Sequence, residues 1–124
     1  MSDDDLEFFF PELNPAENGA IPLPPEDMRF MELKAEPVQD GGPTRVRVYV
    51  EVTAFQKRPY LEVNLYDNTG REIASASIIE PMQRKSVFTL HVRGEQRTGR
   101  FSLAARLFYP DQPDSDSRNI EFEI

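Results

Sequence analysis

Few residues of this 124-residue chain could carry out chemistry, and they are not grouped in the sequence. His91 is the only histidine and cysteine is absent, so a zinc or copper site would rest on carboxylates and no disulfide can form. Ser86 and Ser102 occur in neighbouring predicted strands, where simple alternation explains their positions without a catalytic base. We interpret His91 as a solvent-facing residue and predict that the chain is not an enzyme.

Acidic residues offer the other candidate for a ligand site. Asp111, Asp114 and Asp116 share one loop, and alternate carboxylates can bind calcium through their oxygens. Their spacing lacks the glycine and the final glutamate of an EF-hand loop, and the acidic run at 3–5 has the same weakness. Glycine-rich phosphate-binding turns are also absent from the sequence. We expect an exposed, solvated loop at 111–118, and we predict no metal ion and no cofactor.

The net charge of −8 is unevenly distributed along the chain. Residues 1–43 contain eleven acidic and two basic residues, which gives −9, whereas residues 44–124 contain eleven acidic and twelve basic residues, which gives +1. The acidic total opposes binding of nucleic acid, even though basic residues gather in the second part. We hypothesise instead that the acidic N-terminal tail folds across the basic face of its own body, weakly and in a salt-dependent way.

The segment 44–55 predicts the central strand of the fold. Val46, Val48, Val50 and Val52 alternate with polar residues and Tyr49, which is typical of a strand with one buried and one exposed face. Alternation and turn residues predict seven strands, at 28–38, 44–55, 60–66, 71–79, 86–93, 101–109 and 119–124. Seven short strands with no helical periodicity predict an all-β, antiparallel, two-sheet sandwich. The small residues at 74–77 indicate that the fourth strand lies near an edge.

The N-terminal segment 1–27 is predicted to be an acidic, proline-rich tail that precedes a sandwich domain at 28–124. Five prolines disfavour helix and central strand, so an extended or disordered segment is expected. An apolar cluster nevertheless lies among its acidic residues: Leu6, Phe8, Phe9, Phe10 and Leu13. Three interpretations are open: the rings cap an open end or edge of the sandwich, they dock on another protein, or the tail is neutral.

The strand lengths and turn order from residue 28 to residue 124 resemble the immunoglobulin and fibronectin type III class of β-sandwich. The resemblance is architectural, and its best local point is LHV at 90–92, a polar loop and GRFSL at 99–103. In that class a tyrosine often occupies the corner before the sixth strand, and here the matching position is Phe101, which has no hydroxyl. The core cysteines and tryptophan of antibody domains are absent as well. The resemblance implies a fold and no particular activity.

These observations favour a non-catalytic protein–protein interaction module that binds through its aromatic tail or through a sheet edge. The alternative is an assembly subunit whose tail docks on a neighbouring copy. A small-ligand module would favour exposed tryptophan, which the chain lacks. The expected partner is another protein or a second copy, with no nucleic acid and no membrane. The predicted contact residues are Phe8, Phe9, Phe10, Leu13, Tyr49 and Tyr66.

The first residues, MSDDDLEFFF, have acids where a signal peptide needs positive charge, and the apolar run at 8–10 is too short to span a membrane. A cytoplasmic location is therefore expected. A fragment of a longer or exported protein would have the same features.

Overall fold

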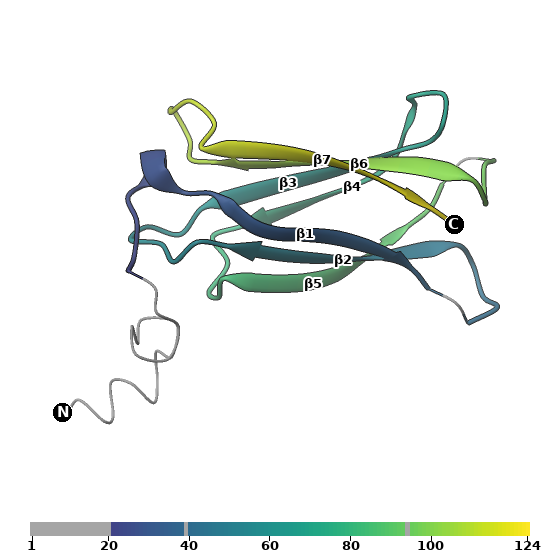
Figure 1. Cartoon of the computed structure of the whole chain (residues 1–124), viewed down its shortest axis with the longest axis horizontal. Coiled ribbons are helices and arrows are strands. Elements are labelled where there is room, and N and C mark those ends of the chain that lie inside the picture. The colour runs from purple at the N-terminus through teal and green to yellow at the C-terminus, as the bar shows by residue number, and fades with distance from the viewer. Residues whose placement is uncertain (1–20, 39, 94) are drawn as a thin grey trace.

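The computed structural model describes residues 21–38, 40–93 and 95–124. In this part of the chain, seven strands form two antiparallel sheets that pack face to face (Figure 1). The strands are β1 (Phe30–Pro37), β2 (Arg45–Val52), β3 (Tyr60–Tyr66), β4 (Glu72–Ile79), β5 (Lys85–His91), β6 (Arg100–Phe108) and β7 (Asp116–Glu123). The predicted all-β sandwich is confirmed. The predicted tail lies mostly in residues 1–20, which are outside the described part.

The alternation in β2 produces the expected two-faced strand. Val46, Val48 and Val52 have no exposed surface, and Val50 is buried beside them, whereas Arg47 points to solvent. β-Branched side chains suit such a strand because their restricted rotamers pack well on a pleated surface. The same alternation buries one face of β3 and β6, so the apolar residues of both sheets meet in a single core.

The first sheet has the strand order β1-β2-β5, and the second has the order β4-β3-β6-β7. In an immunoglobulin constant-type sandwich the fourth strand lies in the same sheet as the first. Here β4 pairs with β3 instead, with Tyr60 opposite Ile79 and Leu65 opposite Ala74. The fourth strand is therefore an edge strand, as its small residues predicted. The free edges of the two sheets are β1 and β5 in one sheet and β4 and β7 in the other.

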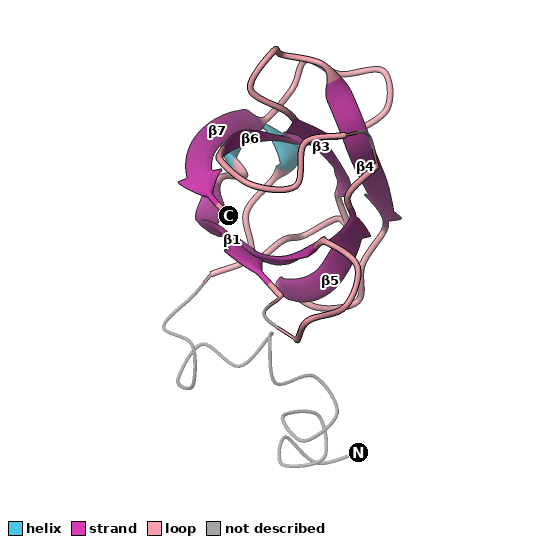
Figure 2. Cartoon of the chain, turned by 90° about the vertical axis from the view of Figure 1, so that its right-hand side faces the viewer, coloured by secondary structure: helices cyan, strands magenta, loops and turns pink. Residues whose placement is uncertain are grey.

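The two sheets adjoin along two long sides of the sandwich. Figure 2 shows β7 above β1 on one side, and β4 descending towards β5 on the other. We refer to these as the β1–β7 side and the β4–β5 side. Each side brings together edge strands from different sheets. The outward backbone N–H and C=O groups of these strands have no neighbouring strand in their own sheet to bond with.

Tyr109, just after β6, anchors one end of the core. Its side chain is 1% exposed, and its hydroxyl donates a hydrogen bond of 2.7 Å to the carbonyl of Lys57 in the β2–β3 connection. Burial raises the pKa of Tyr109 to about 12. Phe101, the position matched to the corner tyrosine, is a core residue, and its ring stacks on Phe122 of β7 at 6.0 Å between centroids.

The segment before β1 lies against the sandwich from residue 21 onwards. Leu23 donates a backbone hydrogen bond of 2.9 Å to Ala54 and accepts one of 3.0 Å from Gln56. A short 3-10 turn, Pro25–Asp27, follows, and Met28 is fully buried. Residues 21–28 therefore contact the β2–β3 connection and enter the core. Within the described residues, no helix is long and apolar enough to cross a membrane.

Candidate protein interaction site

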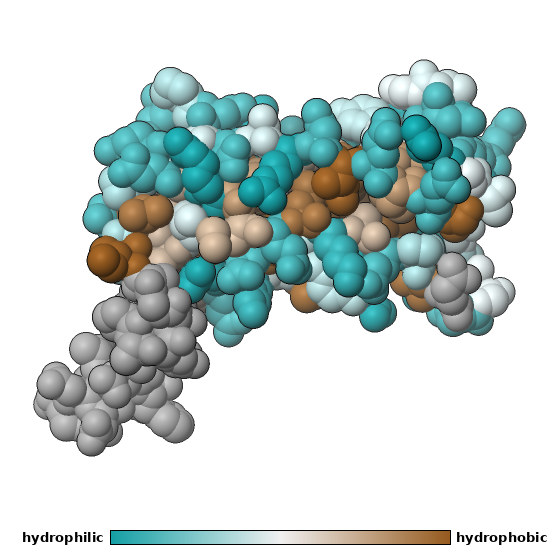
Figure 3. All heavy atoms as spheres, in the orientation of Figure 1, coloured by the Kyte–Doolittle hydropathy of each residue, from teal (hydrophilic) through white to brown (hydrophobic). Residues whose placement is uncertain are grey.

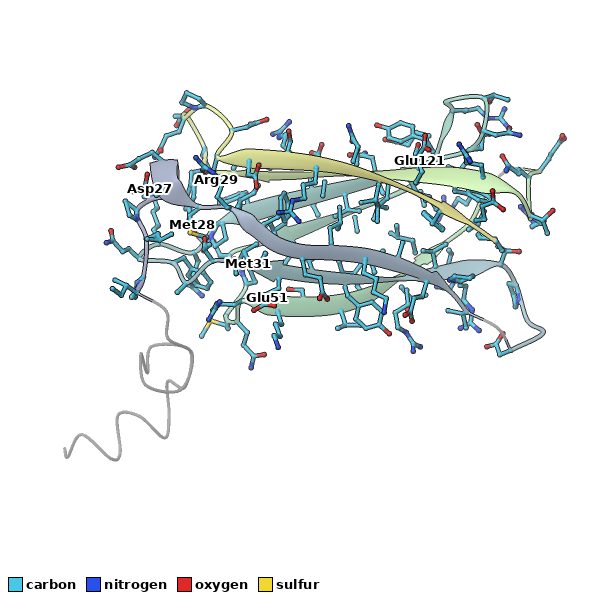
Figure 4. All side chains as sticks on the ribbon, in the orientation of Figure 1. Asp27, Met28, Arg29, Met31, Glu51 and Glu121 are labelled. Atoms are coloured by element: carbon cyan, nitrogen blue, oxygen red, sulfur yellow. The ribbon has the colours of Figure 1, made fainter. Side chains whose placement is uncertain are left out.

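Charged side chains of β7 close the β1–β7 side. The backbone N–H of Phe30 donates a hydrogen bond of 2.9 Å to Oδ2 of Asp116, and Nη2 of Arg118 donates one of 2.8 Å to the carbonyl of Phe30. Arg29 adds a bond of 2.9 Å from Nη1 to the carbonyl of Ser115, and Figure 4 shows its side chain beside the start of β7. Backbone groups at the start of β1 thus find partners on the other sheet.

Asp116 and Arg118 occupy inward positions of β7, opposite Leu107 and Ala105 of β6. Inward-pointing charges on an edge strand prevent another chain from pairing with it, and here they also satisfy the backbone of β1. The predicted exposed loop at 111–118 is therefore wrong for its last three residues. Asp116 and Arg118 occupy the same alternate positions as Ile120 and Phe122, which is the pattern of a strand. Residues 116–118 were nevertheless predicted as a loop because all three are polar.

Apolar side chains fill the rest of the β1–β7 side. Leu33, Ala35, Ile120 and Phe122 are half-buried and pack against the core. Figure 3 shows an apolar stripe running over β1 and β7 on this face. Two further features of β1 disfavour pairing of its free edge with a strand from another chain. These are a bulge at Met31 and a proline at the end of the strand.

The β4–β5 side is hollowed into a groove of about 660 Å³. We call this the β4–β5 groove. It is lined by the first part of β4 with the residue before it, and by the end of β5 with Arg93. One backbone hydrogen bond closes it at its end, from Arg93 to the carbonyl of Ile73 at 3.3 Å. The small side chains Ala74 and Ala76 face inward and leave space that larger residues would fill.

The edge of β4 has few of the features that protect edge strands. Its stretch from residue 74 to residue 79, ASASII, contains no charge and no proline. The one irregularity is a register shift between β3 and β4 at Leu65 and Tyr66, next to the start of β4. Ile79 is 63% exposed at the end of the strand, and Met82 in the following connection is 67% exposed. An uncharged edge beside a groove is suited to pair with an extended peptide.

The rim of the β4–β5 groove carries charges of both signs. His91 and Arg93 have no carboxylate within 4.0 Å among the described residues, whereas Arg71 lies 3.7 Å from Asp67. The one acid in the lining, Glu72, accepts a hydrogen bond of 2.5 Å from Asn64 on the outer face of β3. Lys85, at the other end of β5, also has no carboxylate within that distance in the described structure. Asn64 is neutral, so Glu72 keeps its negative charge and balances that of Arg93 in the groove lining.

The β3–β4 hairpin holds Arg71 and the start of β4 in place. Oδ1 of Asp67 accepts hydrogen bonds from the hydroxyl of Thr69 at 2.6 Å, from its N–H at 2.9 Å and from the N–H of Arg71 at 3.0 Å. These bonds, with that from the Thr69 hydroxyl strongest, lower the pKa of Asp67 below its usual value. Gly70 completes the turn with φ of +85°, which a side chain would disfavour. The sequence DNTG at 67–70 therefore forms the turn of the β3–β4 hairpin.

The predicted contact residues occupy different places. Tyr49 is half-buried on the outer face of the first sheet. Nζ of Lys34 lies 5.6 Å from the centre of its ring, and its hydroxyl donates a hydrogen bond of 3.4 Å to Glu36. Tyr66 is half-buried at the end of β3 on the outer face of the second sheet, opposite Ser102. The two tyrosines therefore do not form one surface. Phe8, Phe9, Phe10 and Leu13 lie outside the described residues.

The candidate chemical residues are also separated. Ser86 belongs to β5 and Ser102 to β6, which are in different sheets rather than neighbouring strands. His91 is exposed at the end of β5, opposite Arg45. Asp114 pairs with Arg106 at 3.4 Å, and Asp116 holds the backbone of β1. No group of three metal-ligating side chains occurs within residues 21–38, 40–93 and 95–124.

The fold is similar to a small part of several large glycosidases. A glycosyl hydrolase family 2 member from Bacteroides cellulosilyticus matches with a TM-score of 0.62 and 17% identity over 79% of this chain, but over only 14% of that chain. The β-glucuronidase of Parabacteroides merdae matches with a TM-score of 0.61 and 10% identity over 78% of this chain and 13% of its own. No protein-family model matches this chain, and no curated protein matches its sequence. At this identity the similarity shows the β-sandwich fold alone.

Proposed function

We propose that this chain is a non-catalytic protein–protein interaction module that accepts an extended strand at the edge of β4. The observation that carries the proposal is the uncharged edge of β4 beside the β4–β5 groove. A strand added there would extend the second sheet through main-chain hydrogen bonds, while its alternate side chains would enter the groove. The separation of His91, Ser86 and Ser102 supports a role without catalysis.

The comparisons support a non-catalytic role in a second way. The matched 79% of this chain covers only 14% of one glycosidase and 15% of another, so it corresponds to one small part of a much larger enzyme. The pairing of β4 with β3 supports a finer description, a fibronectin type III-like variant of the immunoglobulin-like sandwich. Domains of this architecture serve many purposes, so the binding role rests on the edge and groove and not on the fold.

A second copy of the chain is the alternative partner. Two β4 edges could pair with each other in an antiparallel arrangement about a two-fold axis, because each presents the same uncharged stretch. Such a dimer would join two four-stranded sheets into one. This assembly role differs from the first proposal in its dependence on protein concentration, which native mass spectrometry measures directly.

The test uses a matched pair of lysine substitutions on β4. Ala76→Lys places a charge on the inward face of the edge strand, whereas Ser77→Lys places the same charge on the outer face one residue away. The full-length chain and both variants would be used to capture partners from the lysate of the native host. Hydrogen–deuterium exchange on the purified complex would then show which strand the partner covers.

We expect the captured partner to slow exchange of the β4 amides, and we expect Ala76→Lys to weaken binding at least about tenfold while Ser77→Lys does not. Protection confined to other strands, or equal binding by both variants, would overturn the strand-acceptor proposal. Protection of β4 in a dimer of the chain alone would establish the assembly role in its place.

A further inference from the structure

The free edge of β4 is open from Ser75 onwards (Figure 2). At the start of the strand, the carbonyl of Ile73 points away from β3 and accepts the 3.3 Å hydrogen bond from the N–H of Arg93. Backbone groups of successive strand residues point to opposite edges, so those of Ser75, Ser77 and Ile79 point to the same free edge as Ile73. Among the described residues, no loop or neighbouring strand bonds to them there. A partner strand can therefore pair with residues 75–79.

The inward positions of β4 beside this edge carry small side chains. Ala74 lies opposite Leu65 of β3 and Ala76 lies opposite Val63, and both alanines are half-buried in the groove lining. Leu90 of β5, which is 4% exposed, belongs to the same lining. A partner residue opposite Ala76 would point to the same face of the sheet as Ala76 does. Because interiors pack densely, a large side chain at that position would fill space that the alanine methyl groups leave empty.

The stretch available for pairing carries no charge. Residues 74–79 of β4 and residues 87–90 of β5 are all uncharged. The ionisable side chains of the lining lie towards the closed end of the groove, where Arg93 bonds to Ile73, and they are Arg71, Glu72, His91 and Arg93. A charged side chain that entered beside Ala76 would lose water without gaining an ion partner. The charge pattern therefore fits a partner segment whose inward residues are uncharged.

A second copy of the chain fits this edge less well than an extended peptide does. Five paired residues extend over only about 16 Å. A strip of that length is far smaller than the roughly 800 Å² that each partner of a stable protein complex buries. Strand addition by a peptide needs no such area, because main-chain hydrogen bonds give affinity and pockets for alternate side chains give specificity.

We propose that the strand accepted at β4 is an uncharged peptide segment with large apolar side chains opposite Ala74 and Ala76, and that these two alanines select it. This inference rests on the proposed function and deepens it. The segment pairs through its backbone with Ser75, Ser77 and Ile79, and its two inward side chains pack in the groove beside Leu90. Its outward side chains stay in water beside the serines, so they are not selected.

The test uses synthetic peptides in which two variable positions alternate with threonine between glycine and serine ends. The variable positions are both leucine, both alanine or both lysine, and blocked termini remove the end charges. Each peptide is titrated into the isotope-labelled full-length chain, and NMR follows the amide shifts and the hydrogen exchange of β4. We expect the leucine peptide to bind at least about tenfold more tightly than the alanine or lysine peptide, and to slow exchange at Ser75, Ser77 and Ile79.

A matched pair of leucine substitutions tests whether the alanines select the peptide. Ala76→Leu fills the groove from inside the chain, whereas Ser77→Leu places the same side chain on the outer face one residue away. We expect Ala76→Leu, but not Ser77→Leu, to weaken the leucine peptide at least about tenfold and to remove its advantage over the alanine peptide. Thermal unfolding followed by circular dichroism shows whether each variant folds, and Ala74→Leu replaces Ala76→Leu if that variant does not.

Equal affinities of the leucine and alanine peptides, with exchange slowed at Ser75 and Ser77, would overturn this inference and leave the strand-acceptor proposal standing. A leucine peptide that does not bind would also overturn this inference alone, because the strand-acceptor proposal is judged by a captured partner and the Ala76→Lys variant. Slow exchange of β4 that needs no peptide and grows with protein concentration would assign the edge to a second copy. Leucine-selective binding that protects only other strands would contradict both proposals.

Discussion

On the β1–β7 side of the sandwich, Asp116 and Arg118 reach from one sheet to the backbone of the other, whereas on the β4–β5 side small residues leave a groove. Both sides face the same physical problem, since each brings together two edge strands with backbone groups that no strand satisfies. The first side solves it with side chains that act as hydrogen-bonding partners. The second side leaves the stretch from residue 74 to residue 79 without charge, beside an open groove.

The difference shows that edge protection is local and does not follow from the fold. β7 and β4 are the two edges of the same sheet and have the same length of eight residues. Their inward positions differ completely, because β7 begins with an acid and a base whereas β4 has alanines at its centre. Sandwiches with the same topology can therefore present very different surfaces for recognition.

The largest difference in stability between the two sides is expected when one large apolar residue on each side is replaced by alanine. Phe122 packs on Phe101 inside the β1–β7 side, whereas Ile79 is 63% exposed beside the β4–β5 side. Phe122→Ala should lower the free energy of unfolding by about 2–4 kcal/mol, because it opens a cavity next to the core. Ile79→Ala should cost less than about 0.5 kcal/mol. Urea denaturation of both variants measures these values, and equal costs would contradict the comparison.

Tyr109 provides a reference that belongs to neither side. Tyr109→Phe leaves the carbonyl of Lys57 without its partner and should cost about 1–3 kcal/mol. Because burial raises the pKa of Tyr109 from 10.0 to about 12, the unfolded chain loses the phenol proton first as pH rises. The stability of the native chain should therefore be unaffected by this group below pH 10.0 and fall between pH 10.0 and about 12.

The control for this pH dependence is the phenylalanine variant itself, which lacks the titrating group. The loss of stability above pH 10.0 should be smaller in Tyr109→Phe than in the native chain when thermal unfolding is followed by circular dichroism. Identical pH profiles would show that the phenol of Tyr109 titrates normally in the folded state.

A smaller effect is expected from opening the β1–β7 side. Asp116→Ala removes the acceptor for the N–H of Phe30 and should cost about 1–2 kcal/mol. Hydrogen exchange should then accelerate at Phe30 and in the first half of β7, while exchange in β4 stays unchanged. Asp116→Asn keeps an acceptor oxygen and should retain part of the stability. Faster exchange in β4 as well would show that the two sides are coupled.

Much of the fold could be predicted because it depends on local signals. The valines of β2, the DNTG turn and the small residues of β4 each specify a strand, a hairpin or an edge within a few residues. Prediction failed at Asp116 and Arg118, because two charges at inward positions are indistinguishable from a polar loop until their partner Phe30 is known. That partner is distant in sequence, and no local pattern identifies it.

The sequence predicted the type of binding site, a sheet edge, but not the residues that form it. A sheet edge was expected to bind, and β4 was expected to be an edge, but the groove depends on residues 71–76 and 89–93, which come together only in the folded sandwich. Arg93 was visible as a member of a basic set spread over the second part of the chain, but nothing in the sequence grouped it with Arg71. Tyr49 and Tyr66 were placed on outer faces by alternation, but alternation could not show that they belong to different sheets.

The smallest effect, and the most direct comparison of the two sides, comes from one substitution at matched positions. Ala35 of β1 and Ala76 of β4 are both half-buried, inward alanines on edge strands. Ala35→Lys forces a charge between β1 and β7, where Ile120 and Phe122 already pack, and should cost about 1–2 kcal/mol. Ala76→Lys places the charge in an open groove from which the ammonium can reach water, so it should change stability by less than about 0.5 kcal/mol. Equal losses for the two variants would mean that the β4–β5 groove is as tightly filled as the β1–β7 side, and a partner strand could then not enter it.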